Sequence, residues 1–353
     1  MNMLTGFFSK VFFEKISINI AKGSHMSKLG IFRKFAVAFA VVLGIFSVTA
    51  TMLTVSAQDY PSKPIRVVVE YPAGTGGDAV MRALAAYMSK DLGQSVVIEN
   101  RAGGGGVVAA EAVARASPDG YTVLAASSSP LIIRPYIAKA ITVDVFRDLT
   151  PVSLVYNAST VIVSHKSLPV NSLTELITYV KANPGKVFYG TSGLGTSYHF
   201  MGEALDQLGI KMVHVPYKGG TGSMQAVMTG EVPLAFGFSG SAVAAVNSGN
   251  VRVLSLIDGK RFMNFSNLPD LSQVVTGFES PPSWTGLFMP ANTPPGVVRR
   301  LNASVVKALS APDFPNFDGV EPVGSTPEAF ATKLLAQYNL IGRLAKAANI
   351  KPE

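Results

Sequence analysis

Apolar, β-branched runs alternate with amphipathic stretches along most of the sequence. The first run, Ile65–Val69, is followed by Pro72 and has the pattern of a buried strand. A glycine-rich turn comes next, and residues 79–90 have helical spacing, with Asp78 placed where an N-cap belongs. The same order of strand, small-residue turn and helix recurs downstream. Strands that alternate with helices at this spacing predict parallel βαβ units.

The remaining elements continue this pattern to the end of the chain. Further strands are expected at residues 95–99, 121–124, 152–156, 160–164, 187–189, 212–215, 232–236, 251–257 and 286–289. Further helices are expected at residues 107–116, 173–182, 198–208, 222–229, 294–309 and 327–347. The elements make two α/β units of comparable size, so we expect an α/β fold with a ligand cleft between two lobes.

The N-terminal region has the features of a targeting signal. From Met26 a basic segment precedes an apolar run, and Val55–Ala57 fits the small-residue cleavage rule, so residues 26–57 are predicted to be a signal peptide. An uncleaved membrane anchor is the alternative, because the apolar stretch is long. Residues 1–25 are interpreted as a tag or an over-extended start. We therefore expect a periplasmic protein that begins at Gln58.

Composition excludes several classes of protein. The chain of 353 residues is 48% hydrophobic and 15% charged, which is typical of a globular protein of about two domains rather than a disordered one. It has no cysteine, which excludes disulfides, thiolate metal sites, cysteine catalysis and a lipid-modified N-terminus. The net charge of +8 is concentrated at the N-terminus, since 24 of the 30 basic and 21 of the 22 acidic residues follow position 57. Nucleic acid is therefore not an expected partner.

Three glycine-rich loops precede predicted helices, at Tyr71–Asp78, Asn100–Gly106 and Gly190–Ser197. A helix N-terminus presents unpaired N–H groups and partial positive charge, and small residues let an anion approach those groups closely. Hydroxyl groups in the third loop add further donors. A carboxylate is the expected ligand, although each loop alone would also fit glycines that only form tight turns.

Motifs of enzymes and metal sites are incomplete in this chain. The glycine run has no following Lys-Ser/Thr, and Gly190–Leu194 lacks the last glycine of a nucleophile elbow. The dinucleotide fingerprint lacks its third glycine. The histidines of the mature chain, His165, His199 and His214, do not form a helical pair, so no metal site is predicted. No cofactor and no enzymatic activity are expected.

Several segments, taken in order, resemble the substrate-binding proteins of tripartite tricarboxylate transporters, the Bug family. They are Tyr60–Arg66, Tyr71–Asp78, Val97–Arg101, Ser117–Thr122, Ala182–Lys186, Gly190–His199, His214–Gly219 and Trp284–Pro294. The resemblance implies a type II periplasmic-binding-protein fold that has two lobes and two crossings. Lobe 1 would comprise residues 58–157 and 276–353, and lobe 2 residues 158–275.

The resemblance also implies a set of ligand-binding residues in two loops and the segment Ala126–Ser129, which act through backbone amides, hydroxyls and bridging water. The expected residues are Tyr71, Pro72, Ala73, Gly74, Thr75, Gly76, Asp78, Ser127, Ser128, Thr191, Ser192, Gly195, Thr196, Ser197, His199, Tyr217 and Gly237. For His199 and Tyr217 a packing role is an open alternative. Trp284, the one tryptophan, is expected to pack near the crossing between the lobes rather than to contact the ligand.

The sequence departs from the family at two places. Glu70 and Ala73 stand where the family usually has prolines, and Gly237 and Phe238 follow a strand that an aspartate usually follows. Loss of that aspartate argues against a ligand amino group at this point and favours an aromatic or aliphatic acid.

The sequence as a whole predicts a monomeric receptor that captures a small carboxylate by lobe closure and delivers it to membrane transporter subunits. The ligand classes implied are di- and tricarboxylates, amino acids and aromatic acids. A sensory binding protein and a secreted hydrolase that uses Ser192 or Ser197 with His199 are the alternatives.

Overall fold

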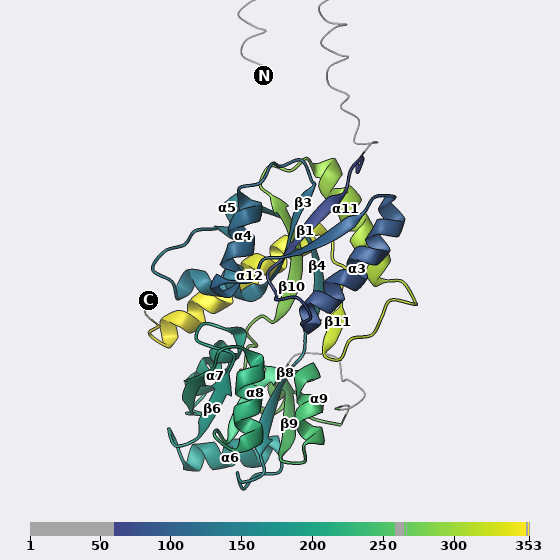
Figure 1. The fold of residues 1–353 in the computed structure, drawn as a ribbon. Coiled ribbons are helices and arrows are strands. Elements are labelled where there is room, and N and C mark those ends of the chain that lie inside the picture. The colour runs from purple at the N-terminus through teal and green to yellow at the C-terminus, as the bar shows by residue number, and fades with distance from the viewer. Residues whose placement is uncertain (1–59, 258–264, 266, 351, 353) are drawn as a thin grey trace, which may run out of the picture. The chain divides into compact units, whose positions relative to one another are not determined.

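A computed structural model describes residues 60–257, 265, 267–350 and 352, whose helices and strands are arranged around two β-sheets (Figure 1). The predicted tag, the signal peptide and the cleavage point after Ala57 lie outside the described residues. In the described ranges, no helix has the length and apolar character needed to cross a membrane.

The first sheet has six strands in the described residues, in the order β11-β4-β10-β3-β1-β2. These strands are β1 (Ile65–Val69), β2 (Val96–Asn100), β3 (Thr122–Ser127), β4 (Leu149–Ala158), β10 (Trp284–Pro290) and β11 (Val320–Pro322). β1 pairs in parallel with β2 and β3, as the alternating pattern predicts. β10 is antiparallel to β3 and to β4, so it does not extend the parallel βαβ pattern.

Helices cover both faces of this sheet. The main ones are α3 (Gly76–Leu92), α4 (Val107–Ala114), α5 (Val145–Asp148), α11 (Pro295–Leu309) and α12 (Pro327–Ala347), with short turns η2 (Gly104–Gly106), η3 (Ser129–Ile133) and η4 (Arg134–Tyr136). Successive strand side chains point to opposite faces. Val67 and Val69 of β1 therefore belong to the apolar cluster that includes α3 and α11, whereas Val68 belongs to the cluster that includes α4 and α12.

The second sheet has the strand order β7-β6-β8-β5-β9. Its strands are β5 (Thr160–His165), β6 (Phe188–Thr191), β7 (Val213–Pro216), β8 (Leu234–Phe238) and β9 (Val251–Ile257). Its helices are α6 (Leu173–Ala182), α7 (Ser197–Gln207), α8 (Gly220–Thr229), α9 (Ser239–Asn247) and α10 (Leu271–Val274). β6 is parallel to β7 and β8, and β5 is antiparallel to β8 and β9.

One residue separates the two sheets where the chain first passes between them. β4 ends at Ala158 and β5 begins at Thr160, so Ser159 is the crossing point. Its N–H donates to Gly319 O at 2.8 Å, and its carbonyl accepts from Ser239 N at 2.9 Å. The crossing is thereby held by the segment before β11 and by the start of α9. The lobe boundaries, 58–157 with 276–353 and 158–275, stay a prediction.

Candidate functional site

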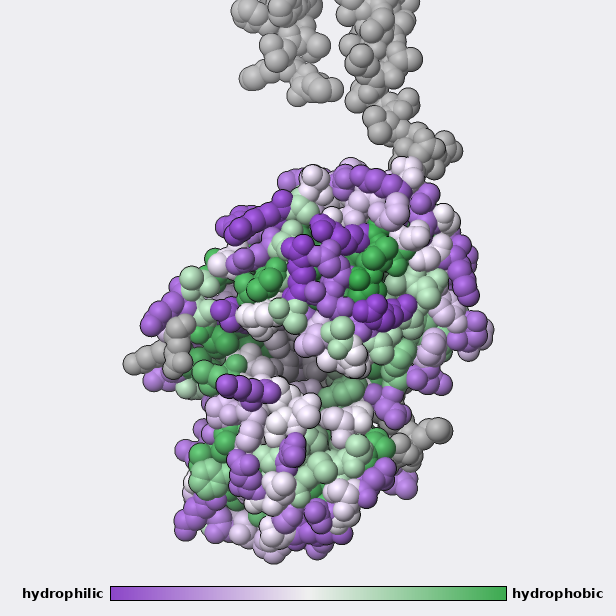
Figure 2. Space-filling view, in the orientation of Figure 1, coloured by the Kyte–Doolittle hydropathy of each residue, from purple (hydrophilic) through white to green (hydrophobic). Residues whose placement is uncertain are grey.

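A cavity of about 580 Å³ opens between elements of the two sheets. Figure 2 shows the hollow near the middle of the visible face, bordered mainly by pale residues of intermediate hydropathy. Small residues, hydroxyl groups and aromatic rings dominate its lining. The lining residues are Tyr71, Gly76, Gly77, Ser127, Ser128, Ser129, Tyr156, Ala158, Ser192, Thr196, Ser197, Tyr198, Phe238, Gly240, Ser241, Ser283, Trp284, Thr285, Phe317, Asp318 and Val320.

The N-terminus of α3 forms one side of the cavity. Thr75 is the N-cap, and its hydroxyl accepts from Asp78 N. The prediction that Asp78 caps the helix is therefore wrong in detail: Asp78 is the third helical residue, because the helix already begins at Gly76. The first N–H groups of a helix have no intrahelical acceptor. The amides of Gly76 and Gly77, both in the cavity lining, are therefore available to a ligand.

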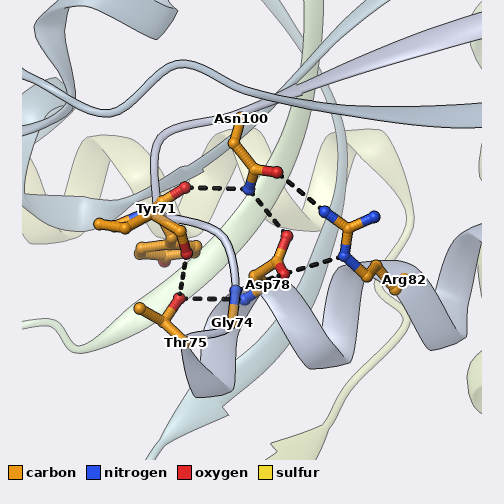
Figure 3. A network of polar contacts seen from close by, with 7 residues as sticks. Tyr71, Gly74, Thr75, Asp78, Arg82 and Asn100 are labelled. Atoms are coloured by element: carbon orange, nitrogen blue, oxygen red, sulfur yellow. Dashed lines mark hydrogen bonds and ion pairs between the residues drawn. The ribbon is translucent and has the colours of Figure 1, made fainter.

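The carboxylate of Asp78, a residue outside the cavity lining, belongs to a polar network (Figure 3). Its carboxylate accepts from Arg82 Nε at 2.9 Å, from Asn100 Nδ2 at 2.7 Å and from Gly74 N at 2.9 Å. Burial acts to raise the pKa of Asp78, but these hydrogen bonds hold the pKa below its usual value. The charge is thus compensated by Arg82, and the network fixes the loop that leads into α3.

The N-terminus of α7 reaches the same cavity from the second sheet. Thr196 is its N-cap and accepts from His199 N, and Thr196, Ser197 and Tyr198 all belong to the lining. The hydroxyl of Ser197 donates to the carbonyl of Pro282, which also accepts from Ser128 Oγ at 2.8 Å. The amides of Ser197 and Tyr198, at the first two helical positions, are left for a ligand.

A third helix, α9, also begins at the cavity. Phe238 precedes it without a side-chain cap, and Gly240 and Ser241 lie in the lining. A Cβ atom added at Gly240 would lie 2.7 Å from the Phe238 ring and 2.6 Å from Asp318 O. The absence of a side chain at Gly240 therefore lets Phe238 and the segment before β11 approach the start of this helix.

A buried carboxyl lies one hydrogen bond away from the cavity. Oε1 of Glu70 accepts from the amide of Ser127, a lining residue, at 2.9 Å. Oε2 has no hydrogen-bond partner among the described residues, and Glu70 is only 8% exposed. Burial raises the pKa of Glu70 to about 7, and the hydrogen bonds with Ser127 only partly oppose that rise.

Two histidines support the loop before α7 instead of lining the cavity. Nδ1 of His199 accepts from Gly195 N at 3.2 Å, and Nε2 of His214 is 2.7 Å from Thr191 Oγ1. The two rings stack with centroids 4.3 Å apart. Burial, and then the neighbouring His199, lower the pKa of His214 to about 4. His199 Nε2 is 3.4 Å from Glu203 Oε1.

The serines of the hydrolase alternative lack a histidine partner among the described residues. Ser197 donates to Pro282 O, and both ring nitrogens of His199 face other groups. The carbonyl of Ser192 accepts a backbone hydrogen bond from Gly219 N. Among the described residues, neither Ser192 nor Ser197 makes a hydrogen bond to His199, the contact that an activated serine would need.

Part of the predicted ligand-binding set meets at the cavity. The residues that do so are Tyr71, Gly76, Ser127, Ser128, Ser192, Thr196 and Ser197. The others lie outside the lining: Pro72, Ala73, Gly74 and Thr75 in an exposed loop, and Asp78, Thr191, Gly195, His199, Tyr217 and Gly237 in supporting positions. Their direct contact with a ligand stays a prediction.

Packing explains several of these supporting positions. A Cβ atom at Gly195 would lie 1.8 Å from Ile137 Cδ1, so Gly195 is needed where the loop packs against the segment after η4. Tyr217 donates its hydroxyl to Glu231 Oε1 at 2.8 Å, and its ring lies 3.1 Å from the Cβ position of Gly190 on β6. Trp284 is 2% exposed and donates to Gln337 Oε1 at 2.6 Å, but it also lines the cavity.

Other lining residues were not predicted as ligand-binding. Tyr156 and Asp318 come from segments distant in sequence from the glycine-rich loops, and no local motif marks either of them. Phe238 was noted only as a departure from the family pattern. Within the part of the chain that the structure describes, the lining contains no Lys or Arg side chain, and Asp318 is its one acidic residue.

Comparison with known proteins adds to this geometry. Residues 80–349 match the family described as "Tripartite tricarboxylate transporter family receptor". This chain belongs to that family. Protein BugT of Bordetella pertussis is 33% identical over 294 residues, which cover 81% of this chain and 90% of BugT.

Solved structures of relatives have the same fold. The periplasmic binding protein BugD is 30% identical with a TM-score of 0.70, over 83% of this chain and 100% of BugD. An R. palustris protein whose structure was solved with adipate is 30% identical with a TM-score of 0.73, over 84% of this chain and 100% of that protein. The predicted family and the two-lobed periplasmic-binding-protein fold are confirmed.

Proposed function

We propose that this protein is a periplasmic receptor that binds a small carboxylate in the cavity between its two sheets. The observation that carries this proposal is the convergence of the α3 and α7 N-termini on one cavity. Each helix start supplies unpaired amides and partial positive charge, a combination that binds anions without a cationic side chain. The adipate bound by the R. palustris relative supports a carboxylate as the ligand.

Capture requires both groups of donors to meet the ligand together. Gly76 and Gly77 belong to the first sheet's helices, whereas Ser197 and Tyr198 belong to the second sheet's helices. A ligand that bridges them stabilises the closed arrangement, so its binding free energy biases a two-state hinge at the Ser159 crossing. The closed receptor then delivers its ligand to membrane transporter subunits, and we expect it to act as a monomer.

The direct test is a thermal-shift panel of carboxylates, each paired with its neutral amide. A ligand at a hundred times its Kd adds about 2.7 kcal/mol to the free energy of unfolding, which is a measurable shift. Adipate is one member of the panel. The proposal predicts stabilisation by one class of acid and none by the matching amides. Equal stabilisation by acid and amide would contradict binding at helix N-termini.

A pair of cap variants separates ligand binding from stability. Thr196→Ala removes the N-cap of α7 in the cavity lining, and Thr326→Ala removes the N-cap of α12 on an exposed segment. Each change is expected to cost about 1 kcal/mol of stability. Only Thr196→Ala should weaken carboxylate binding, by about tenfold, because the α7 amides lose their fixed orientation. Equal affinity in both variants would argue against the role of α7.

Delivery and location need tests in the cell. A strain that lacks the protein should lose uptake of the identified acid, and fractionation should recover the mature chain from the periplasm. Recovery from the cytoplasm, or unchanged uptake, would contradict the transport role and leave the binding activity to be explained otherwise.

A further inference from the structure

The charges around the cavity are distributed unevenly. Among the described residues, its lining holds no Lys or Arg and one carboxylate, that of Asp318 in the segment before β11. Asp78 at α3 is neutralised by Arg82, and its oxygens accept three hydrogen bonds. Asp318 is exposed and has no ion pair or hydrogen bond to another described side chain. Of the lining residues that the structure describes, it is therefore the one charge that is left for a ligand or for solvent.

Asp318 lies at the α9 side of the cavity. Its carbonyl is 2.6 Å from the Cβ position of Gly240, so its backbone packs against the first turn of α9. An acidic residue at that place offsets the partial positive charge of the α9 N-terminus. At the α3 and α7 N-termini, the described lining residues include no such unpaired acid. A ligand carboxylate is thus favoured at α3 and α7 and disfavoured beside Asp318.

The surroundings of Asp318 are apolar. Phe238 and Phe317 line the cavity with it, and the Phe238 ring lies within 2.7 Å of the Cβ positions of both Gly240 and Gly319. Aromatic faces attract cations and accept apolar groups, but they offer no donor to a second carboxylate. This part of the cavity therefore matches a cationic or donor group that is attached to an apolar chain.

We propose that Asp318 is a specificity-determining residue: the ligand has one carboxylate at the α3 and α7 N-termini, and an ammonium or other hydrogen-bond donor at its distal end beside Asp318. This inference rests on the proposed carboxylate-binding function and specifies its ligand class. From the sequence, the loss of an aspartate at position 237 argues against a ligand amino group at that point. The proposal revises this expectation, because Asp318, in the segment before β11, supplies a carboxylate to the same cavity.

Three acids with the same six-carbon chain provide the test: 6-aminohexanoate, hexanoate and adipate. They share one carboxylate and differ only in a distal ammonium, methyl or second carboxylate. An exposed pair of charges changes affinity by a few-fold. Exchanging a distal carboxylate for an ammonium removes a repulsion from Asp318 and adds an attraction to it, so the two effects multiply. Calorimetric titration of the purified protein should therefore show 6-aminohexanoate binding about tenfold more tightly than adipate, with a smaller difference in 0.5 M salt.

Two variants show whether Asp318 causes this preference. Asp318→Asn should reduce the difference between 6-aminohexanoate and adipate to less than about threefold and leave hexanoate binding nearly unchanged. Asp313→Asn is the matched control, since Asp313 is an exposed acid between α11 and β11 and lies outside the cavity lining. It should retain the tenfold preference.

The outcomes distinguish this inference from the proposed function. If adipate binds the unaltered protein as tightly as 6-aminohexanoate, the role of Asp318 is wrong while carboxylate binding stands. A preference that survives Asp318→Asn also overturns it. If some acid in the wider panel binds but none of these three does, the linear donor-bearing ligand is wrong. If no acid binds and no acid stabilises the protein, the proposed function itself fails.

Discussion

Replacing Glu70 by glutamine measures the cost of burying a carboxylate next to the ligand cavity. The amide has nearly the shape of the protonated acid, and its oxygen can still accept from Ser127 N. Unlike the acid, glutamine cannot ionise. The variant therefore removes a single titration from the pH dependence of stability and keeps the packing around Gly106, whose Cβ position lies 2.3 Å from Glu70 Oε2.

The magnitude follows from the raised pKa of Glu70. Raising that pKa from 4.5 to about 7 corresponds to about 3 kcal/mol, at about 1.4 kcal/mol per pH unit. Between these two values the folded protein holds a proton that the unfolded chain releases. The free energy of unfolding therefore falls as pH rises, and the contribution that is complete below about pH 4.5 is lost above about pH 7.

Urea denaturation at pH 4.5, 6, 7 and 8 tests this expectation. The free energy of unfolding of Glu70→Gln, minus that of the unaltered protein, should increase by about 3 kcal/mol from pH 4.5 to pH 8. Glu328→Gln, which changes an exposed acid in the first turn of α12, is the control and should give a constant difference. A constant difference for Glu70→Gln as well would refute the inference that this carboxyl is buried without a partner for Oε2.

Three further predictions use other parts of the structure. Hydrogen bonds from Lys307 first and then Arg300 lower the pKa of Asp91 to about 2, so Asp91 should contribute about 2 kcal/mol to the free energy of unfolding above about pH 4. This contribution should be lost as pH falls through about 2. Asp91→Asn should remove the contribution in urea denaturation, and an unchanged dependence of stability on pH would contradict the ion pairs. Trp284 is the one tryptophan and lines the cavity, so its fluorescence should change on ligand binding, and an unchanged spectrum at saturation would place the ligand elsewhere. Gly286→Ala would place a Cβ atom 2.3 Å from the Phe330 ring and should lower the free energy of unfolding by about 1–3 kcal/mol. In Gly185→Ala the added Cβ meets no atom within 4 Å, so the strain at its φ of +69° is the only cost expected there.

The sequence alone was sufficient for the fold class and the family. The β-branched run Ile65–Val69 falls on β1, a parallel strand inside the first sheet, because burial on both faces requires nearly continuous apolar residues. The helix predicted at residues 173–182 coincides with α6, which Ser172 caps, since capping depends on residues a few positions apart. The ordered motifs also identified the family, which the matched relatives confirm.

The composition of the candidate site was decided by tertiary structure. Tyr156 and Asp318 join the glycine-rich loops only because β4, β10 and β11 are adjacent in the first sheet. In contrast, Thr191 and His199 belong to the expected loop, but folding turns their side chains into contacts with His214 and Gly195. Local sequence fixes which backbone segments form helix N-termini, because caps and glycines act over a few residues. Which side chains share a cavity depends on contacts between segments more than 100 residues apart, for which a single sequence contains no local signal.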